Sequence, residues 1–339
     1  MPSAWPSRAS GTVEAGWSLH GQDAVVLANE HLRVVVLPEL GGKVWQITDV
    51  HTGRRLLWQN PSVPLGPVPF GSSYDDTFVG GWDVLFPNDA PEVLADETFP
   101  DHGELWTSRW ACTLGPGDHS VTLSTQGRIS ACHVTRRLTL LPGARHLTVD
   151  IEVVNNSGRA LPFLWKEHLA LTPEPGSAVH LPPCDVEIGD FGHPRSGRPG
   201  DRTRWPHLGS PARDGRPTLE RASRVSELLY TSGAEDGWCA MTYADGVAVA
   251  LVHDLATLPA CWVFASYGGW RDLEVTVLEP CSGWPVSVAD GVAAGTHQLL
   301  AADETLRTTV RLVVDHGQGA VTGVTTSTEG EPRLIRDQR

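Results

Sequence analysis

An acidic side chain interrupts an apolar row late in the sequence. The run Leu273 to Glu279 alternates so that Leu273, Val275, Val277 and Glu279 share one face of a strand. Burying a charge there is costly unless it is bound or its pKa rises, and both outcomes suit a catalytic base. We expect Pro280 to end this strand and leave Glu279 at its mouth.

A compact polar turn carries a first histidine. Between Pro100 and Trp106, the side chains of Asp101, His102 and Glu104 surround a glycine. An imidazole titrates near neutral pH, so this turn could serve acid-base chemistry, although a solvated surface turn would look the same.

A second histidine lies within an apolar run. Alternation places Lys166 and His168 on one face of a strand, with Trp165 and Glu167 on the other. Three consecutive ionisable residues are costly in such a strand unless it lines a cavity or lies at a sheet edge.

Tryptophan is abundant, with thirteen Trp against four Tyr. Its ring can stack on the C–H surface of a sugar, and its N–H can donate to a hydroxyl. The tryptophans beside candidate polar residues are Trp82, Trp106, Trp110, Trp165, Trp270 and Trp284. We expect at least half of all thirteen to fill the core instead.

The charge balance argues against nucleic acid as a partner. Lys plus Arg number 26 and Asp plus Glu 40, for a net charge of -14, and no basic run is interleaved with aromatics. No leader pattern or apolar run of membrane length is present, so we expect a soluble, cytoplasmic protein without membrane association. The six scattered cysteines favour buried thiols over disulfides or zinc ligands.

The elements that must position these residues are short strands separated by turns. No long amphipathic helical pattern occurs, which predicts an all-β fold, a large antiparallel β-sandwich, forming a single domain over residues 1–316. Residues 317–339 are small and polar and predict a flexible tail. The expected strands are Ala24–Ala28, Leu32–Leu37, Lys43–Val50, Ser120–Thr125, Ile129–Leu140, Leu147–Asn155, Pro162–Leu171, Val225–Tyr230, Trp238–Tyr243, Val247–His253, Ala260–Ser266, Leu273–Glu279 and Leu306–Val314.

Two segments break this regularity. Asn60 to Thr98 is rich in Gly, Pro, Asp and aromatics, and Pro182 to Pro217 is rich in Pro, Gly and Arg. Long ordered loops often form the rim of a site. For the second segment, a disordered insertion is an equal alternative.

Three short motifs, in this order, resemble those of the aldose 1-epimerases, the galactose mutarotase-like proteins: Leu85-Phe86-Pro87-Asn88, then Asp101-His102-Gly103 with Trp106, then Leu278-Glu279-Pro280 with Pro285. The strand bearing His168 lies between the second and third motifs, and the resemblance spans residues 25 to 314. It implies a supersandwich whose concave face holds a small-molecule carbohydrate.

The resemblance also implies roles for three residues. Glu279 would remove the anomeric proton, His168 would protonate the ring oxygen, and His102 would bind and polarise the sugar. Ring opening, rotation and closure then yield the other anomer. The residue types agree, because a tuned carboxylate and imidazole supply acid-base catalysis without a metal or cofactor.

Other positions are expected to contact the sugar, and some depart from the family pattern. The expected contacts are Asn88, Trp82, Trp106, Lys166, Glu104 and Trp284. Asp89 stands where family members commonly carry arginine, and Lys166-Glu167 replaces a more usual sequence, so the substrate contacts must differ. Asp83 and Asp254 are both candidates for the family's sugar-binding aspartate.

Three alternatives stay open at this stage. The cleft could catalyse elimination or isomerisation of a sugar derivative, or the protein could bind carbohydrate without catalysis. His102, Glu104, His168 and Glu279 could also supply ligands to one divalent ion. A catalytic interpretation expects His168 and Glu279 to face each other across one pocket, about one sugar ring apart. The oligomeric state and the identity of the sugar do not follow from the sequence.

Overall fold

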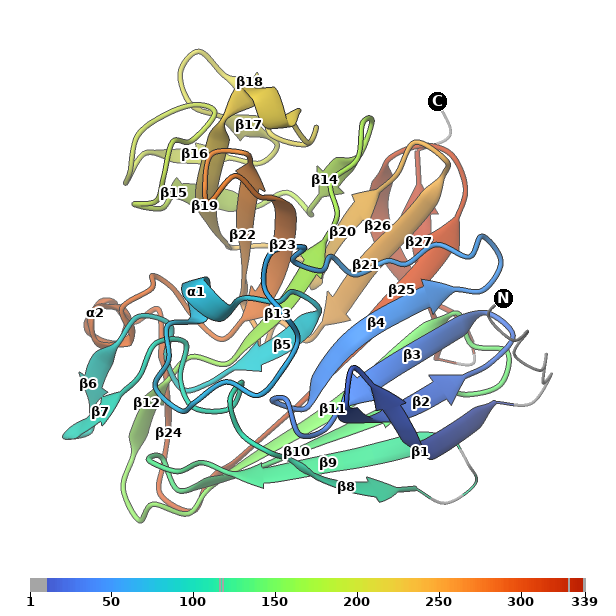
Figure 1. The fold of residues 1–339 in the computed structure, drawn as a ribbon. Coiled ribbons are helices and arrows are strands. Elements are labelled where there is room, and N and C mark those ends of the chain that lie inside the picture. Colours follow the sequence, from blue (N-terminus) through green and yellow to red (C-terminus); the bar gives the residue numbers. More distant parts are fainter. Residues whose placement is uncertain (1–10, 116, 118, 329, 338–339) are drawn as a thin grey trace.

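Two large antiparallel sheets dominate the computed structural model, which describes residues 11–115, 117, 119–328 and 330–337 (Figure 1). Within those residues, the 13-stranded sheet has the order β1 (Thr12–Leu19), β2 (Gln22–Ala28), β3 (Leu32–Leu37), β4 (Lys43–Asp49), β5 (Trp82–Leu85), β13 (Lys166–Leu171), β23 (Glu274–Cys281), β22 (Ala260–Tyr267), β19 (Val225–Ser232), β15 (Asp185–Ile188), β16 (Arg202–Arg204), β17 (His207–Leu208) and β18 (Arg213–Asp214). The 8-stranded sheet has the order β14 (Ala178–His180), β20 (Trp238–Thr242), β21 (Val247–His253), β25 (Thr305–His316), β11 (His146–Asn155), β10 (Cys132–Thr139), β9 (Ser120–Gln126) and β8 (Ala111–Leu114). The predicted all-β antiparallel sandwich is therefore confirmed.

The remaining elements are small. Three two-stranded sheets pair β12 (Leu161–Phe163) with β24 (Gln298–Leu300), β26 (Val321–Thr326) with β27 (Pro332–Arg336), and β6 (Glu92–Leu94) with β7 (Glu97–Phe99). The helical segments described are α1 (Tyr74–Thr77), α2 (Val288–Ala294) and a 3₁₀ turn at Arg221–Ser223. In Figure 1, α1 lies beside β5 and β13, the strands that carry the polar cluster described below.

Alternation along the strands builds the main core. On β11, Leu147, Val149, Ile151 and Val153 are buried in one cluster that includes residues of both large sheets. The side chains between them on β11 are less buried, which confirms that one face is core and the other wet. Trp82 is fully buried in the same cluster, so it fills core.

The strand carrying Glu279 does not end where we expected. β23 continues through Pro280, which pairs with Cys261, to Cys281, which pairs with both Ala260 and Lys166. A proline removes only one backbone donor, and its φ suits an extended strand, so the neighbouring pairs keep the ladder together. Glu279 therefore lies within the sheet and not at the mouth of a strand.

The expected strand Pro162–Leu171 is two strands in different sheets. β12 pairs with β24, whereas β13 lies between β5 and β23 in the large sheet. Leu164 and Trp165 connect them, and the Trp165 N–H donates to the hydroxyl of Ser282 (2.8 Å). The break allows β13 to enter the centre of the large sheet with its own alternation.

Both irregular segments contain ordered structure. Pro182 to Pro217 forms β15, β16, β17 and β18, which extend the large sheet at the top of Figure 1, so the disordered alternative is wrong. Asn60 to Thr98 contains α1, β5 and β6 and supplies one wall of the polar cluster. Short strands with many turn residues hide the alternation that identifies a strand from sequence.

Most of the segment expected to be a flexible tail, residues 317–339, forms a hairpin, and its residues 329, 338 and 339 lie outside the described residues. β26 and β27 pair with each other, and Val321 and Leu334 pack in a cluster with Trp238 of β20. The Arg336 guanidinium also binds Asp315 of β25 (2.8 Å), which ties the hairpin to the sandwich. Among the described residues, no helix is long and apolar enough to cross a membrane.

Candidate active site

A row of ionisable residues crosses three adjacent strands of the large sheet. β5 and β13 pair Asp83 with His168, and the β13–β23 register places His168 opposite Glu279. Directly opposite residues on antiparallel strands point to the same face. The strand pairing therefore places Asp83, His168 and Glu279 side by side on the same face of the sheet.

Lys166 lies at the centre of this cluster. Its Nζ is 2.7 Å from Glu279 Oε2, also forms an ion pair with Asp89, and lies 4.3 Å from the ring centre of Trp262. Burial alone would lower the pKa of Lys166, but the carboxylates of Asp89 and Glu279 outweigh it and raise that pKa. Lys166 is therefore a buried, charged ammonium group.

The predicted base and acid meet beside this ammonium group. His168 Nε2 is 3.9 Å from Glu279 Oε1, and the two residues are only 6% and 2% exposed. Burial raises the pKa of Glu279, with Lys166 acting against the rise, whereas burial and the charge of Lys166 lower the pKa of His168 well below its usual value. The pKa values of the two groups therefore shift toward each other, which favours proton exchange between Glu279 and His168.

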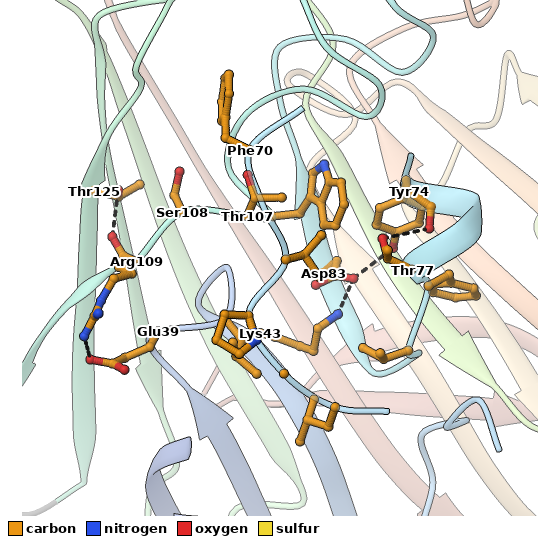
Figure 2. Close-up of a pocket in the computed structure, with 18 of the residues that line it drawn as sticks. Glu39, Lys43, Phe70, Tyr74, Thr77, Asp83, Thr107, Ser108, Arg109 and Thr125 are labelled. Carbon is orange, nitrogen blue, oxygen red and sulfur yellow. Dashed lines mark hydrogen bonds and ion pairs between the residues drawn. The ribbon is translucent and has the colours of Figure 1, made fainter. Parts of the chain in front are cut away.

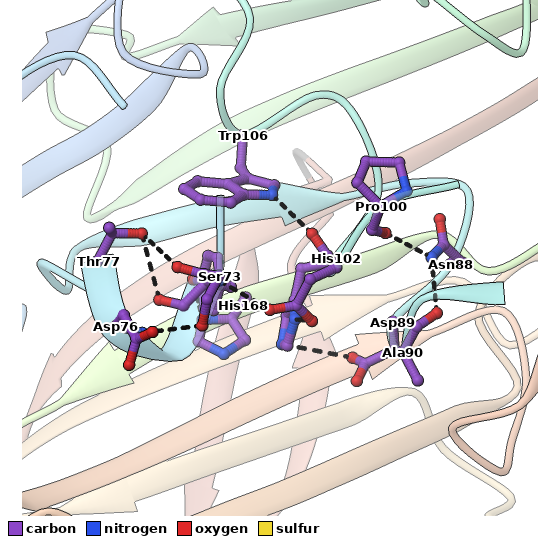
Figure 3. A network of polar contacts seen from close by, with 12 residues as sticks. Ser73, Asp76, Thr77, Asn88, Asp89, Ala90, Pro100, His102, Trp106 and His168 are labelled. Atoms are coloured by element: carbon purple, nitrogen blue, oxygen red, sulfur yellow. Dashed lines mark hydrogen bonds and ion pairs between the residues drawn. The ribbon is translucent and has the colours of Figure 1, made fainter. Parts of the chain in front are cut away.

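His102 reaches the same cluster from a strained turn. Its φ is +57°, and a Cβ on the adjacent Gly103 would lie 2.0 Å from the carbonyl oxygen of Phe86. This close approach, which only glycine permits, joins the first two sequence motifs. The His102 Nδ1 is 2.8 Å from Asp101 Oδ1, and its Nε2 points toward Asp89 at 3.8 Å (Figure 3).

The pH dependence of stability should report on His102. Burial acts to lower its pKa, but Asp89 and Asp101 outweigh burial and raise it above the ordinary value of 6.5. A raised pKa stabilises the fold below the unfolded-state value, and that stability is lost as pH rises through the folded-state value. As pH rises above about 6.5, the free energy of unfolding should therefore fall more steeply in wild type than in His102→Gln. Urea unfolding of both proteins at a series of pH values on either side of 6.5 tests the difference, and parallel profiles would contradict it.

Helix α1 adds a residue that the sequence did not reveal. The Tyr74 hydroxyl is 2.8 Å from Asp83 Oδ2 and 3.2 Å from His168 Nδ1, and the Tyr74 ring stacks on His102 at 4.2 Å. Lys43 of β4 forms an ion pair with the same carboxylate oxygen of Asp83. The sequence does not identify Tyr74 and Lys43 as site residues, because a four-residue helix and a lysine in a strand carry no distinctive local pattern.

A cavity of about 490 Å³ adjoins this cluster on the α1 side (Figure 2). Lys43, Tyr74, Asp83 and Trp106 are among its lining residues, whereas Glu279, His168 and His102 are not. Tyr74 thus contacts the cavity and, through its hydroxyl, His168 as well.

Two of the expected sugar contacts have structural roles instead. Trp82 is fully buried, and its Nε1 donates to Glu167 on the core side of the sheet (2.7 Å). Glu104 is also fully buried, and its carboxylate accepts from the N–H groups of Ile129 (2.6 Å) and Ser130 (3.1 Å). The polar atoms of both residues are engaged away from the cluster, which argues against the expected contact with a sugar there.

The remaining expected contacts lie around the cluster at different depths. The Asn88 amide group donates to the carbonyls of Ala90 and Pro100, both at 2.8 Å, so it holds the turns that carry Asp89 and His102. Trp106 lines the 490 Å³ cavity, and Trp284 lines a separate cavity of about 570 Å³.

The structure also places the other charged residues that the sequence singled out. Of the two candidate aspartates, Asp83 belongs to the cluster, whereas Asp254 lines a groove with residues of β10, β11 and β25. Glu167 faces the core, where it lies 3.6 Å from Arg136. The four-ligand set that included Glu104 is not assembled, and the described residues contain no other group suited to a metal ion.

No family model and no curated protein sequence matches the chain. Solved structures do resemble it. A galactose mutarotase related enzyme from Lactobacillus acidophilus has a TM-score of 0.62 at 12% identity, covering 86% of this chain and 97% of its own. A galactose mutarotase-like protein from Clostridium acetobutylicum has a TM-score of 0.60 at 14% identity, covering 91% and 100%.

A third solved structure, the Slr1438 protein from Synechocystis sp. PCC 6803, has a TM-score of 0.65 at 14% identity and covers 94% of this chain and 100% of its own. At these identities the similarity establishes architecture, not chemistry. The chain therefore has the fold of the galactose mutarotase-like proteins, as its three motifs predicted.

Proposed function

We propose that the protein is a cofactor-independent sugar epimerase that interconverts the anomers of an aldose or aldose derivative. The observation that carries the proposal is the buried pair of His168 and Glu279, 3.9 Å apart on neighbouring strands of a mutarotase-like sheet. Glu279 acts as base, His168 as acid, and His102 as the group that binds and polarises the sugar near its ring oxygen.

The separation of the pair matches the demands of the reaction. A distance of 3.9 Å leaves no room for a sugar ring between the two groups, contrary to the arrangement we expected. The anomeric hydroxyl and the ring oxygen are bonded to the same carbon, however, so they lie close together. Two groups on one side of the sugar can therefore reach both oxygens at once.

The proposed steps conserve protons. Glu279 takes the proton of the anomeric hydroxyl while His168 gives a proton to the ring oxygen, and the bond between the anomeric carbon and the ring oxygen breaks. The aldehyde group rotates, and attack on its opposite face with the reverse proton transfers yields the other anomer. The enzyme ends with the same number of protons as it began.

The charges of the cluster support the presence of one proton that His168 and Glu279 share. The cluster contains four carboxylates and two ammonium groups, namely Asp83, Asp89, Asp101, Glu279, Lys43 and Lys166. A protonated His102 leaves one negative charge, and a single proton shared by His168 and Glu279 neutralises it. A neutral cluster is the state that burial favours.

The sugar is proposed to approach the side chains of the cluster that are partly exposed to solvent. The side chains of His102, Asp89 and His168 are 15%, 11% and 7% exposed, more than those of Glu279 and Lys166. Asp89, which Lys166 holds through an ion pair, would then meet a sugar hydroxyl in place of the arginine common in the family. This arrangement supports a substrate whose hydroxyl pattern or substituents differ from those of galactose.

Polarimetry tests the proposal directly. Purified protein is added to freshly dissolved α-glucose, α-galactose and a panel of other aldoses and their derivatives, and optical rotation is followed. We expect the approach to equilibrium to accelerate for at least one sugar, with the same rate after treatment with a chelator. No acceleration with any sugar would refute the proposal, and loss of activity on chelation would favour a metal-assisted reaction.

A second candidate is elimination or isomerisation of an oxidised sugar derivative. The ammonium group of Lys166, 2.7 Å from Glu279, favours it because a cation beside the base can stabilise a developing enolate. Proton NMR of oxidised sugars incubated with the protein in deuterated water distinguishes the two. Deuterium incorporation at the carbon next to the carbonyl supports this alternative, whereas anomer exchange alone supports the epimerase.

A purely binding function predicts a different pattern. Calorimetric titration would then detect a sugar, but polarimetry would show no acceleration with the same sugar.

A further inference from the structure

The tyrosine on α1 lies between a carboxylate and the proposed acid. Its hydroxyl is 2.8 Å from Asp83 Oδ2 and 3.2 Å from His168 Nδ1, and Asp83 is itself ion-paired with Lys43. All three members of this chain are nearly inaccessible, since Tyr74 is 3%, Asp83 1% and His168 6% exposed. Tyr74 and Asp83 also line the 490 Å³ cavity, but the Tyr74 hydroxyl is already engaged by Asp83 and His168.

Counting protons assigns a direction to each hydrogen bond. An ionised carboxylate paired with an ammonium group can only accept, so Asp83 takes the single hydroxyl proton of Tyr74. Burial and the neighbouring Asp83 raise the pKa of Tyr74 well above its usual value, so this proton stays on the tyrosine. The Tyr74 oxygen is then left as an acceptor, and the only role open to His168 Nδ1 is that of donor.

We propose that Asp83 and Tyr74 are positioning residues that keep one proton of His168 on Nδ1, so that Nε2 is the atom that exchanges protons with the sugar and with Glu279. The inference rests on the proposed function for its catalytic consequence, but not for the tautomer itself. Transfer of the shared proton to Nε2 gives the imidazolium that protonates the ring oxygen, while the Nδ1–H bond to Tyr74 is unchanged. The arrangement uses the same logic as a carboxylate that orients a catalytic histidine through Nδ1.

The surroundings of the imidazole hold this orientation. The rings of Tyr74 and Phe78 contact it edge-on, with centroids 5.3 and 5.2 Å away. Of the charged groups, Glu279 of β23 faces Nε2, and Lys166 lies two residues earlier on β13. Burial and the nearby cations also lower the pKa of His168 well below its usual value, so its resting form is neutral.

Nitrogen NMR of protein with ¹⁵N-labelled histidine tests the tautomer without any substrate. The His168 signals are identified by their loss in His168→Gln, and spectra are recorded near pH 8. We expect a neutral ring with the proton on Nδ1. A neutral ring with the proton on Nε2, or an imidazolium at this pH, would overturn the proposal whether or not the protein is an epimerase.

Two substitutions test the chain that sets the tautomer. In Asp83→Asn, the amide N–H can donate to the Tyr74 oxygen, which reverses the bonds and moves the His168 proton to Nε2. Tyr74→Phe keeps the ring stacked on His102 but removes the acceptor, so the Nδ1–H form loses its preference. The second variant retains every charge, and it keeps the test valid if Asp83→Asn fails to fold.

Activity then separates positioning from a structural role. For a sugar that wild type accelerates, Tyr74→Phe should lower kcat by about 10- to 100-fold with little change in KM. The matched control is Tyr243→Phe, a buried tyrosine outside the cluster, which should leave kcat unchanged. An unaltered kcat in Tyr74→Phe would refute the positioning role. If no sugar is accelerated but the Nδ1–H form is found, the proposed function fails and the tautomer assignment stands.

Discussion

Glu279→Gln should abolish most of the acceleration of anomer exchange, lowering kcat by about 100- to 10,000-fold. The amide keeps the shape of the side chain but cannot accept the anomeric proton. It also removes a negative charge beside Lys166, which is 2.7 Å away in the wild type. Polarimetry at saturating sugar measures the change, and circular dichroism and urea unfolding establish that the variant is folded.

The matched control for this substitution is Glu227→Gln on β19. Glu227 is likewise buried and ion-paired, with Arg195 at 2.7 Å, but it does not belong to the cluster. Arg195 keeps its hydrogen bonds to the carbonyls of Gly215 and Pro217, so the variant should fold and retain wild-type kcat. Equal activity in wild type and Glu279→Gln would refute the role of Glu279 as base.

Lys166→Met should be the most destabilising single change in the cluster. It leaves the carboxylates of Asp89 and Glu279 buried without their shared cation, and breaking a buried ion pair from one side costs about 3–5 kcal/mol. Catalysis should fall as well, since without Lys166 the pKa of Glu279 rises further and less of the carboxylate form is present. Urea unfolding at pH 7 measures the stability, and polarimetry measures the rate.

Adding Asp89→Asn to Lys166→Met provides the control. The double variant has one fewer uncompensated carboxylate, so it should recover part of the lost free energy of unfolding while activity stays low. Destabilisation by less than about 1 kcal/mol in Lys166→Met would contradict a buried ion pair at this position.

The parts of the site that could be predicted from sequence depend on alternation within one strand. Lys166 and His168 on one face, and Glu167 on the other, follow from the two-residue period of β13, and the structure shows this division. The same period could have separated Trp82 from Asp83 on β5, because only one of two consecutive residues can face the cluster. The ability of Trp82 to stack on a sugar suggests a place at the site, whereas its position on the strand places it in the core.

Other features depend on contacts between distant segments. Tyr74 acts on residues 9 and 94 positions away, and Lys43 pairs with a residue 40 positions away, so no local pattern reveals either contact. The partners of Glu104 are hidden for a related reason, because they are backbone N–H groups at positions 129 and 130, and every residue except proline carries such a group. The strand end at Pro280 was wrong because pairing with two neighbouring strands outweighs the loss of one donor.

The two faces of β13 have a consequence for folding fidelity. A shift of this strand by one residue would exchange its faces. Glu167 would then join Asp89 and Glu279, gathering three carboxylates, while the Lys166 ammonium group would turn toward the buried Arg136. Like charges would crowd both sides of the sheet, so the misaligned pairing would be disfavoured electrostatically. The charges proposed for catalysis thereby also act as an alignment check on the central strand.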